Sequence, residues 1–136
     1  MIFGTGIDMI KLDRVSNVLN RYDTKFPKKI LGLDELEKYY YYKKKDNNKS
    51  LSFLASRFAA KEAFSKALGL GIRAPMSWKN IQFLNNKLGA PKALIMGSLK
   101  KFMDKNTLVT EVSISDTKEY CIALIILLQI KNNNGD

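Results

Sequence analysis

Residues 51–68 read LSFLASRFAAKEAFSKAL, and this stretch decides the fold. It is rich in alanine and other strong helix formers, and Gly69 follows it as a helix stop signal. At about 100° per residue, its apolar side chains point in nearly every direction around the helix axis. Because a helix that is apolar on all sides has to be covered by other elements, we predict a long, buried, central helix.

Upstream of this helix the chain changes its hydrophobic period. Met1–Ile10 is dominated by large apolar residues and predicts a buried strand. Lys11–Tyr22 switches to a helical period, and another helix is expected from Leu33 onward, with Asp34 as its N-cap. Lys43–Lys49 is polar, charged and rich in asparagine, so we expect a mobile connection there.

Downstream, the pattern favours strands. Asn80–Leu84 and Pro91–Met96 predict one hairpin, and Leu108–Ser115 and Glu119–Ile130 predict a second. A short helix is expected between them, at Ser98–Met103. Helices in the first half and antiparallel strands in the second predict an α+β fold, with an antiparallel sheet packed around the central helix.

Length and composition favour one compact domain. The chain has 136 residues, 46% of them hydrophobic, and we expect a single domain over residues 1–130 with a disordered tail at 131–136. No apolar run is long enough to cross a bilayer, and the first residues lack the basic lead of a secretory signal. A single cysteine, Cys121, rules out an intrachain disulfide framework. We therefore expect a cytoplasmic protein without a membrane partner.

The charge balance favours an anionic partner. Lys and Arg number 23 against 13 Asp and Glu, a formal net charge of +10. Nucleic acid, an acidic protein surface and a polyphosphate ligand all fit this balance. We do not expect nucleic acid, because the aromatic residues lie on apolar stripes and not among exposed cations. The chain has no histidine, which excludes histidine-ligated zinc sites, Ser-His-Asp triads and histidine general bases.

Two carboxylates lie among apolar neighbours. Asp8 interrupts the first strand, and Glu62 lies on the central helix. A buried carboxylate has to be paired, hydrogen-bonded or bound to a cation. One interpretation is a structural ion pair between Glu62 and Lys66, which are four residues apart on the helix. The other is a hard-metal site in which Asp8 and Glu62 are completed by water and phosphate oxygens.

Basic residues form two further groups. Arg57, Lys61 and Lys66 lie along the central helix, either as a solvated face or as cations that offset a phosphate-rich ligand. The first helix and its continuation carry a second basic stripe, which is either solvated or a docking face for an acidic helix. This stripe consists of Arg14, Arg21, Lys25, Lys28 and Lys29.

Three segments together resemble a known family. They are Gly6-Ile7-Asp8 with Arg14 following, RFAAKEAFSKA at residues 57–67, and Ser113-Ile114-Ser115. Their order, spacing and the chain length are similar to those of the holo-acyl-carrier-protein synthases, the short, single-unit branch of the 4'-phosphopantetheinyl transferases. The resemblance extends over about residues 1–130.

The resemblance implies a magnesium-dependent transfer of 4'-phosphopantetheine from coenzyme A to a serine of apo acyl carrier protein, for fatty acid biosynthesis. Asp8 and Glu62 resemble the magnesium ligands, and Lys66 the cation that steadies the leaving phosphate. In the absence of histidine, Glu62 is the first candidate for the general base and Asp8 the second. A homotrimer is implied, with the active site between neighbouring subunits.

The resemblance also implies which residues bind the two substrates. The basic stripe matches the docking helix for the acidic helix of apo acyl carrier protein. The implied coenzyme A contacts are Arg57, Lys61, Lys66, Gly69, Gly71, Gly89, Pro91, Asp116 and Thr117.

Two positions depart from the family pattern. Asp116 stands where the family usually has histidine, and Leu70 where it commonly has threonine. Three alternatives stay open: Thr117 and Lys118 replace the contacts of the imidazole, Asp116 faces away, or Asp116 joins the metal shell. A non-catalytic protein of the same fold that binds coenzyme A or the carrier is therefore the alternative function.

Overall fold

The computed structural model describes residues 1–131. Most of the tail expected at 131–136 therefore lies outside the described residues. The elements in chain order are β1 (Ile2–Lys11), α1 (Leu12–Arg21), α2 (Lys25–Ile30), α3 (Leu33–Lys45), α4 (Asn47–Leu68), β2 (Ile81–Asn85), β3 (Pro91–Ile95), α5 (Gly97–Lys105), β4 (Leu108–Asp116) and β5 (Tyr120–Gln129).

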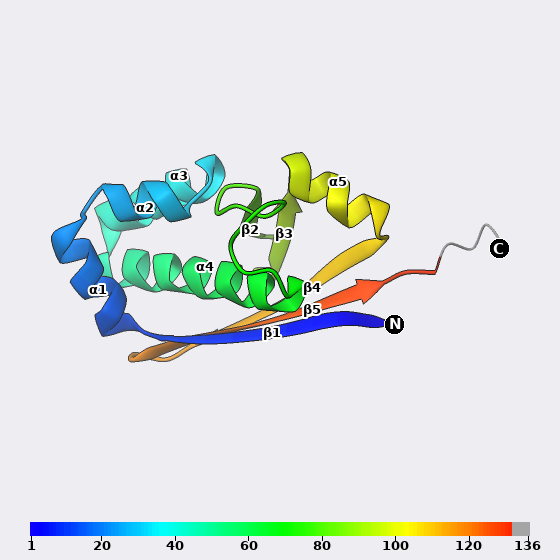
Figure 1. Ribbon diagram of the computed structural model, residues 1–136. Helices are drawn as coiled ribbons and strands as arrows, with labels where there is room; N and C mark the ends of the chain where they lie inside the picture. Colours follow the sequence, from blue (N-terminus) through cyan, green and yellow to red (C-terminus); the bar gives the residue numbers. More distant parts are fainter. Residues whose placement is uncertain (132–136) are drawn as a thin grey trace.

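Helix α4 lies between two layers (Figure 1). On one side is an antiparallel sheet in the order β1-β5-β4, in which β5 pairs with both neighbours. On the other side lie α2, α3 and the separate two-stranded sheet β2-β3 (Figure 1). Covered on both sides, α4 buries most of its residues, which confirms the α+β fold with a buried central helix.

Two glycines let α4 lie directly on β1. Gly4, Gly6 and Asp8 alternate with exposed residues, as expected for one face of a strand. A Cβ at Gly6 would overlap the carbonyl oxygen of Ala63, and one at Gly4 the carbonyl oxygen of Ala67. The backbones of β1 and α4 are therefore in contact, which brings the next inward residue of β1, Asp8, to the side of α4.

Both predicted hairpins are confirmed: β2 pairs with β3, and β4 with β5. The mobile connection expected at Lys43–Lys49 is wrong, because α3 continues to Lys45 and α4 begins at Asn47. Asp46 separates the two helices and caps the second, its carboxylate accepting a hydrogen bond from the Asn48 N–H at 2.9 Å.

The predicted cap of α3 also needs correction. Gly32, not Asp34, precedes the helix as its N-cap. The Glu35 carboxylate accepts a hydrogen bond from the Gly32 N–H at 3.0 Å, so the third residue of the helix pairs with the backbone N–H of the N-cap residue. Within residues 1–131, no helix is both long enough and apolar enough to cross a membrane.

The contact between α4 and β1 predicts the effect of one substitution. Gly6→Ala should lower the free energy of unfolding by about 2 kcal/mol or more, because the new methyl group meets helix backbone that cannot move aside. Lys101→Ala, at an exposed position of α5, is the control and should change it by less than about 0.5 kcal/mol. Chemical denaturation measures both; equal stability of Gly6→Ala and the unaltered protein would contradict the close contact.

Candidate functional site

Asp8, Glu62 and Lys66 form a group beside β1, here called the carboxylate cluster. The Lys66 Nζ donates to Asp8 Oδ1 at 3.2 Å and to the Ile7 carbonyl at 3.0 Å. The side chains of Asp8 and Lys66 are 18% and 54% exposed, so both are accessible to a ligand. The ion pair expected between Glu62 and Lys66 does not form within residues 1–131; Lys66 pairs with Asp8 instead.

The surroundings of the Glu62 carboxylate favour the binding of a cation or of a proton. Partial burial raises the pKa of Glu62, the charge of Asp8 raises it further, and Lys66 opposes the shift. Residues 1–131 contain no cluster of three or more Asp, Glu, Cys or His that would enclose a metal. Two neighbouring carboxylates nevertheless fit magnesium, which usually takes one or two and completes its shell with water and phosphate oxygens.

A pocket lies on the other side of α4, between α4, the β2-β3 hairpin and β4. It is here called the arginine pocket, and four of the predicted coenzyme A contacts line it: Arg57, Gly89, Pro91 and Asp116. Other lining residues were not predicted, among them Tyr42, Lys49, Ser52 and Asn85. Lys49 and Ser52 lie about two turns and one turn before Arg57 on α4, and this helical spacing was the available signal.

Arg57 forms the floor of this pocket and is 6% exposed. Its Nε donates to the Phe83 carbonyl at 2.9 Å, Nη1 to Ser56 Oγ at 2.9 Å and Nη2 to Asn85 Oδ1 at 3.1 Å. Burial lowers the pKa of Arg57, and the charge of Glu35 opposes that shift. A guanidinium has five N–H groups, so Arg57 keeps donors beyond these three contacts.

Asp116 lies at the rim of the arginine pocket. Its Oδ2 accepts a hydrogen bond from Ser52 Oγ at 2.7 Å, so the side chain does not face away. Thr117 is engaged in the β4–β5 turn, where its Oγ1 accepts from the Tyr120 N–H at 3.0 Å. Within one chain, Asp8 and Asp116 lie on the two opposite edge strands of the main sheet, so Asp116 does not complete a metal shell with Asp8 and Glu62 of its own chain.

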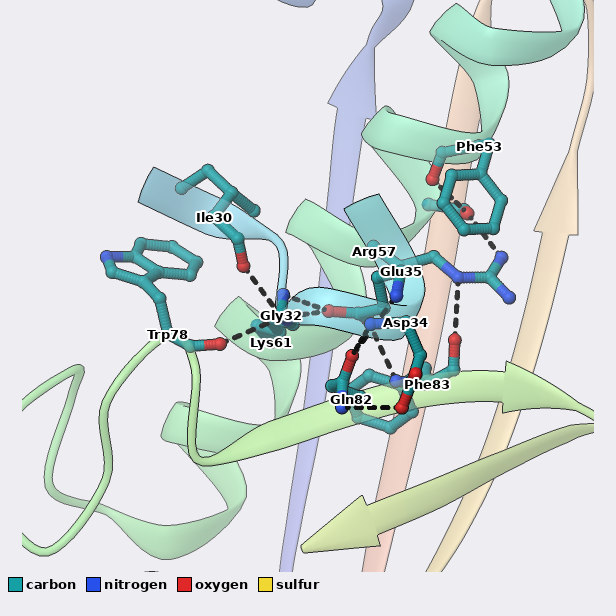
Figure 2. Close-up of polar contacts among 11 residues, drawn as sticks. Ile30, Gly32, Asp34, Glu35, Phe53, Arg57, Lys61, Trp78, Gln82 and Phe83 are labelled. Atoms are coloured by element: carbon teal, nitrogen blue, oxygen red, sulfur yellow. Dashed lines mark hydrogen bonds and ion pairs between the residues drawn. The ribbon is translucent and has the colours of Figure 1, made fainter. Parts of the chain in front are cut away.

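The prediction that Lys61 contacts coenzyme A is wrong. Its side chain is completely buried, and its Nζ donates to Glu35 Oε1, the Ile30 carbonyl and the Trp78 carbonyl (Figure 2). These contacts use all the N–H groups of an ammonium. Burial lowers the pKa of Lys61, and the negative charge of Glu35 opposes the shift. Lys61 is therefore part of the interior and not of a ligand surface.

Gly69 and Gly71 follow the C-terminal end of α4. Gly69 has φ of 80° and caps the helix, its N–H donating to the carbonyls of Ser65 and Lys66. Gly71 has φ of 72°, and a Cβ atom added at either glycine would have no neighbour within 4 Å. Both present open backbone just beyond Lys66, and their contact with coenzyme A stays a prediction.

The basic stripe lies on α1 and α2, and all five of its residues are exposed. Arg14 and Arg21 line a shallow hollow together with Asn17 and Tyr22. Within residues 1–131, none of the five basic side chains forms an ion pair. The stripe therefore offers unneutralised positive charge to an acidic partner.

The carboxylate cluster and the arginine pocket lie at opposite edges of the main sheet. Asp8 on β1 is paired with Ala123 of β5, whose other neighbour is Ile114 of β4, a pocket residue. On α4, Arg57 and Glu62 point about 140° apart. Cys121 lies between the two groups; burial raises its pKa to about 11, which disfavours the nucleophilic thiolate form. One chain thus carries the carboxylate cluster and the arginine pocket as two separate groups of candidate residues.

Comparisons with known proteins point to one family. Residues 4–125 match the family model of the 4'-phosphopantetheinyl transferase superfamily. A holo-[acyl-carrier-protein] synthase of Herminiimonas arsenicoxydans is 47% identical over 93% of this chain and 98% of its own length.

Two solved structures also match. The holo-[acyl-carrier-protein] synthase of Neisseria meningitidis superposes with a TM-score of 0.86 at 32% identity, covering 94% of this chain and 99% of the other. The Bacillus anthracis synthase, solved in complex with coenzyme A (3',5'-ADP), gives a TM-score of 0.77 at 33% identity, covering 93% and 96%. The chain therefore belongs to the 4'-phosphopantetheinyl transferase superfamily, and its relatives within it are holo-[acyl-carrier-protein] synthases.

Proposed function

We propose that this chain transfers 4'-phosphopantetheine from coenzyme A to a serine hydroxyl of apo acyl carrier protein. The observation that carries the proposal is that a carboxylate pair with an adjacent lysine and a separate basic pocket occur in one chain of this family. The related Bacillus anthracis protein binds coenzyme A in its solved structure. We place the reaction in fatty acid biosynthesis in the cytoplasm.

The residues of the carboxylate cluster have separate tasks in this reaction. The serine oxygen attacks the β-phosphorus of coenzyme A and forms a new P–O bond, while the P–O bond within the pyrophosphate breaks and 3',5'-adenosine bisphosphate leaves. Glu62, whose pKa is raised by burial and by Asp8, accepts the serine proton. The half-exposed Lys66 ammonium offsets the charge of the departing phosphate.

Asp8 and Glu62 are the residues that would hold magnesium. When bound, the ion would neutralise charge on the pyrophosphate and orient it. Lys66 pairs with Asp8 in the described structure, and its side chain is exposed enough to swing toward a phosphate. The arginine pocket would hold the nucleotide part, with Lys49 and Arg57 supplying positive charge and Gly89 and Pro91 the wall.

A homotrimer would join the carboxylate cluster of one copy and the arginine pocket of another into one active site, so that each group is a half-site. Because the carboxylate cluster and the arginine pocket face opposite edges of the sheet, one coenzyme A reaches both only where two copies meet. Contact between the β1 edge of one copy and the β4 edge of the next is head-to-tail, and such contacts form a ring when the rotation between copies closes. We propose a ring of three, as the family resemblance implies.

The outer face of the main sheet supports association between copies. Large apolar side chains on this face are exposed, and they form cross-strand neighbours such as Ile7 with Leu124 and Met9 with Ile122. A contiguous exposed apolar patch of this kind marks an interaction surface. The residues of this face are Phe3, Ile7, Met9, Val109, Ile122 and Leu124.

Intact mass spectrometry of the carrier tests the proposed reaction. With coenzyme A, apo acyl carrier protein and magnesium, the carrier should gain the mass of one phosphopantetheine, and a chelator should prevent the gain. Glu62→Gln should lower the rate at least about 100-fold without loss of fold, because the proton acceptor and one metal ligand are removed. Glu37→Gln, on the exposed face of α3, is the control and should keep full activity.

A folded protein that binds coenzyme A but never adds mass to a carrier would instead identify the non-catalytic alternative. Near-normal turnover of Glu62→Gln would contradict the role assigned to Glu62.

The basic stripe predicts a separate kinetic effect. Arg14→Glu should raise KM for the carrier by about tenfold and leave KM for coenzyme A within about twofold, because complementary charge guides the carrier and not the nucleotide. Lys101→Glu, an equal charge change at an exposed position of α5, is the matched control. Steady-state kinetics with each substrate varied in turn measure both constants; equal carrier KM values for the two variants would show that the stripe is only a solvated surface.

A further inference from the structure

Lys61 ties α4 to three segments on the side away from the main sheet. Its buried Nζ donates to Glu35 Oε1 at 2.5 Å, to the Ile30 carbonyl at 2.7 Å and to the Trp78 carbonyl at 2.8 Å (Figure 2). These acceptors belong to α3, the end of α2 and the segment before β2. The Lys61 ammonium thus connects α4 to α2, to α3 and to the segment before β2.

Glu35 continues this connection to β2. Its Oε2 accepts a hydrogen bond from the Phe83 N–H at 2.9 Å, while Oε1 serves Lys61 and the Gly32 N–H. Gln82 reinforces the same junction, since its Oε1 accepts from the N–H groups of Asp34 and Glu35 at 2.9 and 3.1 Å. The first turn of α3 and the first half of β2 are therefore held together by buried polar contacts.

Phe83 is held from both sides of its backbone. Glu35 accepts its N–H, and Arg57 Nε donates to its carbonyl at 2.9 Å (Figure 2). Arg57 also donates to Asn85 Oδ1 at 3.1 Å, at the end of β2 that lines the arginine pocket. Arg57 and Lys61 are one turn apart on α4. The helix is therefore connected to β2 directly through Arg57 and, one turn later, through Lys61 and its partner Glu35.

No strand pairing joins the β2-β3 hairpin to the main sheet. Its two strands pair only with each other within residues 1–131. The hairpin is therefore held by the packing of its buried Ile81 and Phe83 side chains and by the polar contacts described above. Asn85, Gly89 and Pro91 of this hairpin form one wall of the arginine pocket, so the polar connection to α4 sets where that wall stands.

We propose that Lys61 and Glu35 are positioning residues for the arginine pocket. They fix β2 against α4, and through Phe83, Arg57 and Asn85 they set the width of the pocket without touching its ligand. The inference rests on the proposed function, in which this pocket takes the nucleotide part of coenzyme A. A pair that only stabilised the fold would change the free energy of unfolding and leave coenzyme A affinity unaltered.

The double variant Glu35→Gln/Lys61→Met tests this proposal. It removes both charges at nearly constant volume, so no unpaired charge is left buried. The dissociation constant and KM for coenzyme A should both rise at least about tenfold, with kcat and the carrier KM within about twofold. Lys100→Met/Asp104→Asn removes an exposed ion pair of the same charges on α5 and should change none of these values.

Hydrogen exchange locates the change. In the double variant, residues 81–95 should exchange faster, while β1 and β5 keep their protection. Unaltered coenzyme A affinity in the folded variant, or faster exchange spread evenly over the chain, would overturn the proposal.

Glu35→Gln alone is the second variant, should the double variant not fold. It keeps Lys61 and both of its carbonyl contacts, but it weakens the contacts to Phe83 and Gly32 and leaves the buried Lys61 charge without its counter-charge. Its coenzyme A dissociation constant should rise about threefold or more, and an unaltered value would also overturn the proposal. Failure of the unaltered protein to bind coenzyme A would contradict the proposed function itself, so the two failures are distinguishable.

Discussion

The direct contact between the backbones of α4 and β1 is the constraint on which the rest of the structure depends. Gly4 and Gly6 leave no side chain between helix and strand, so the backbone of α4 lies directly against the backbone of β1. In this position Lys66 reaches Asp8, and the charge of Asp8 raises the pKa of Glu62. The same placement leaves the opposite side of α4 free to form a pocket with β4 and the β2-β3 hairpin. The positions of the carboxylate cluster and of the arginine pocket are therefore consequences of how one helix lies on one sheet.

The layer of α2, α3 and the β2-β3 hairpin is held to α4 in part by buried charged groups, and burying a charge is energetically unfavourable. Burying Lys61 and Glu35 removes two charges from water, and their attraction repays that cost only if the remaining donors and acceptors are satisfied. Here the Lys61 ammonium has three acceptors and both Glu35 oxygens have donors. Such a fully satisfied network specifies one arrangement of its members. It thereby fixes α3 and β2 relative to α4.

Much of the fold was predictable from the sequence, and the exceptions have physical reasons. Hydrophobic periods identified α4 and both hairpins, because these elements bury regular faces. They failed at Lys43–Lys49, where asparagine and lysine suggested a loop although α3 runs to Lys45 and Asp46 caps the next helix. Asp8, Glu62 and Lys66 were predicted together and do lie together. The burial of Lys61 was not predictable, because its partner Glu35 is 26 residues away and no local pattern links them. Tyr42 was missed in the pocket for the same reason, since only the folded chain brings it to Asp116.

The central claim is that one active site is built from the carboxylate cluster of one copy and the arginine pocket of the next. Mixing two disabled chains tests it most directly. One chain carries Glu62→Gln, and the other carries Lys49→Glu with Arg57→Gln, so each lacks one half-site. Co-expressed, the two should form mixed assemblies in which intact halves meet, and transfer to the carrier should return well above the sum of the separate chains. Mixed assemblies, verified by native mass, with no more activity than that sum would contradict the account and place both halves of the site within a single chain.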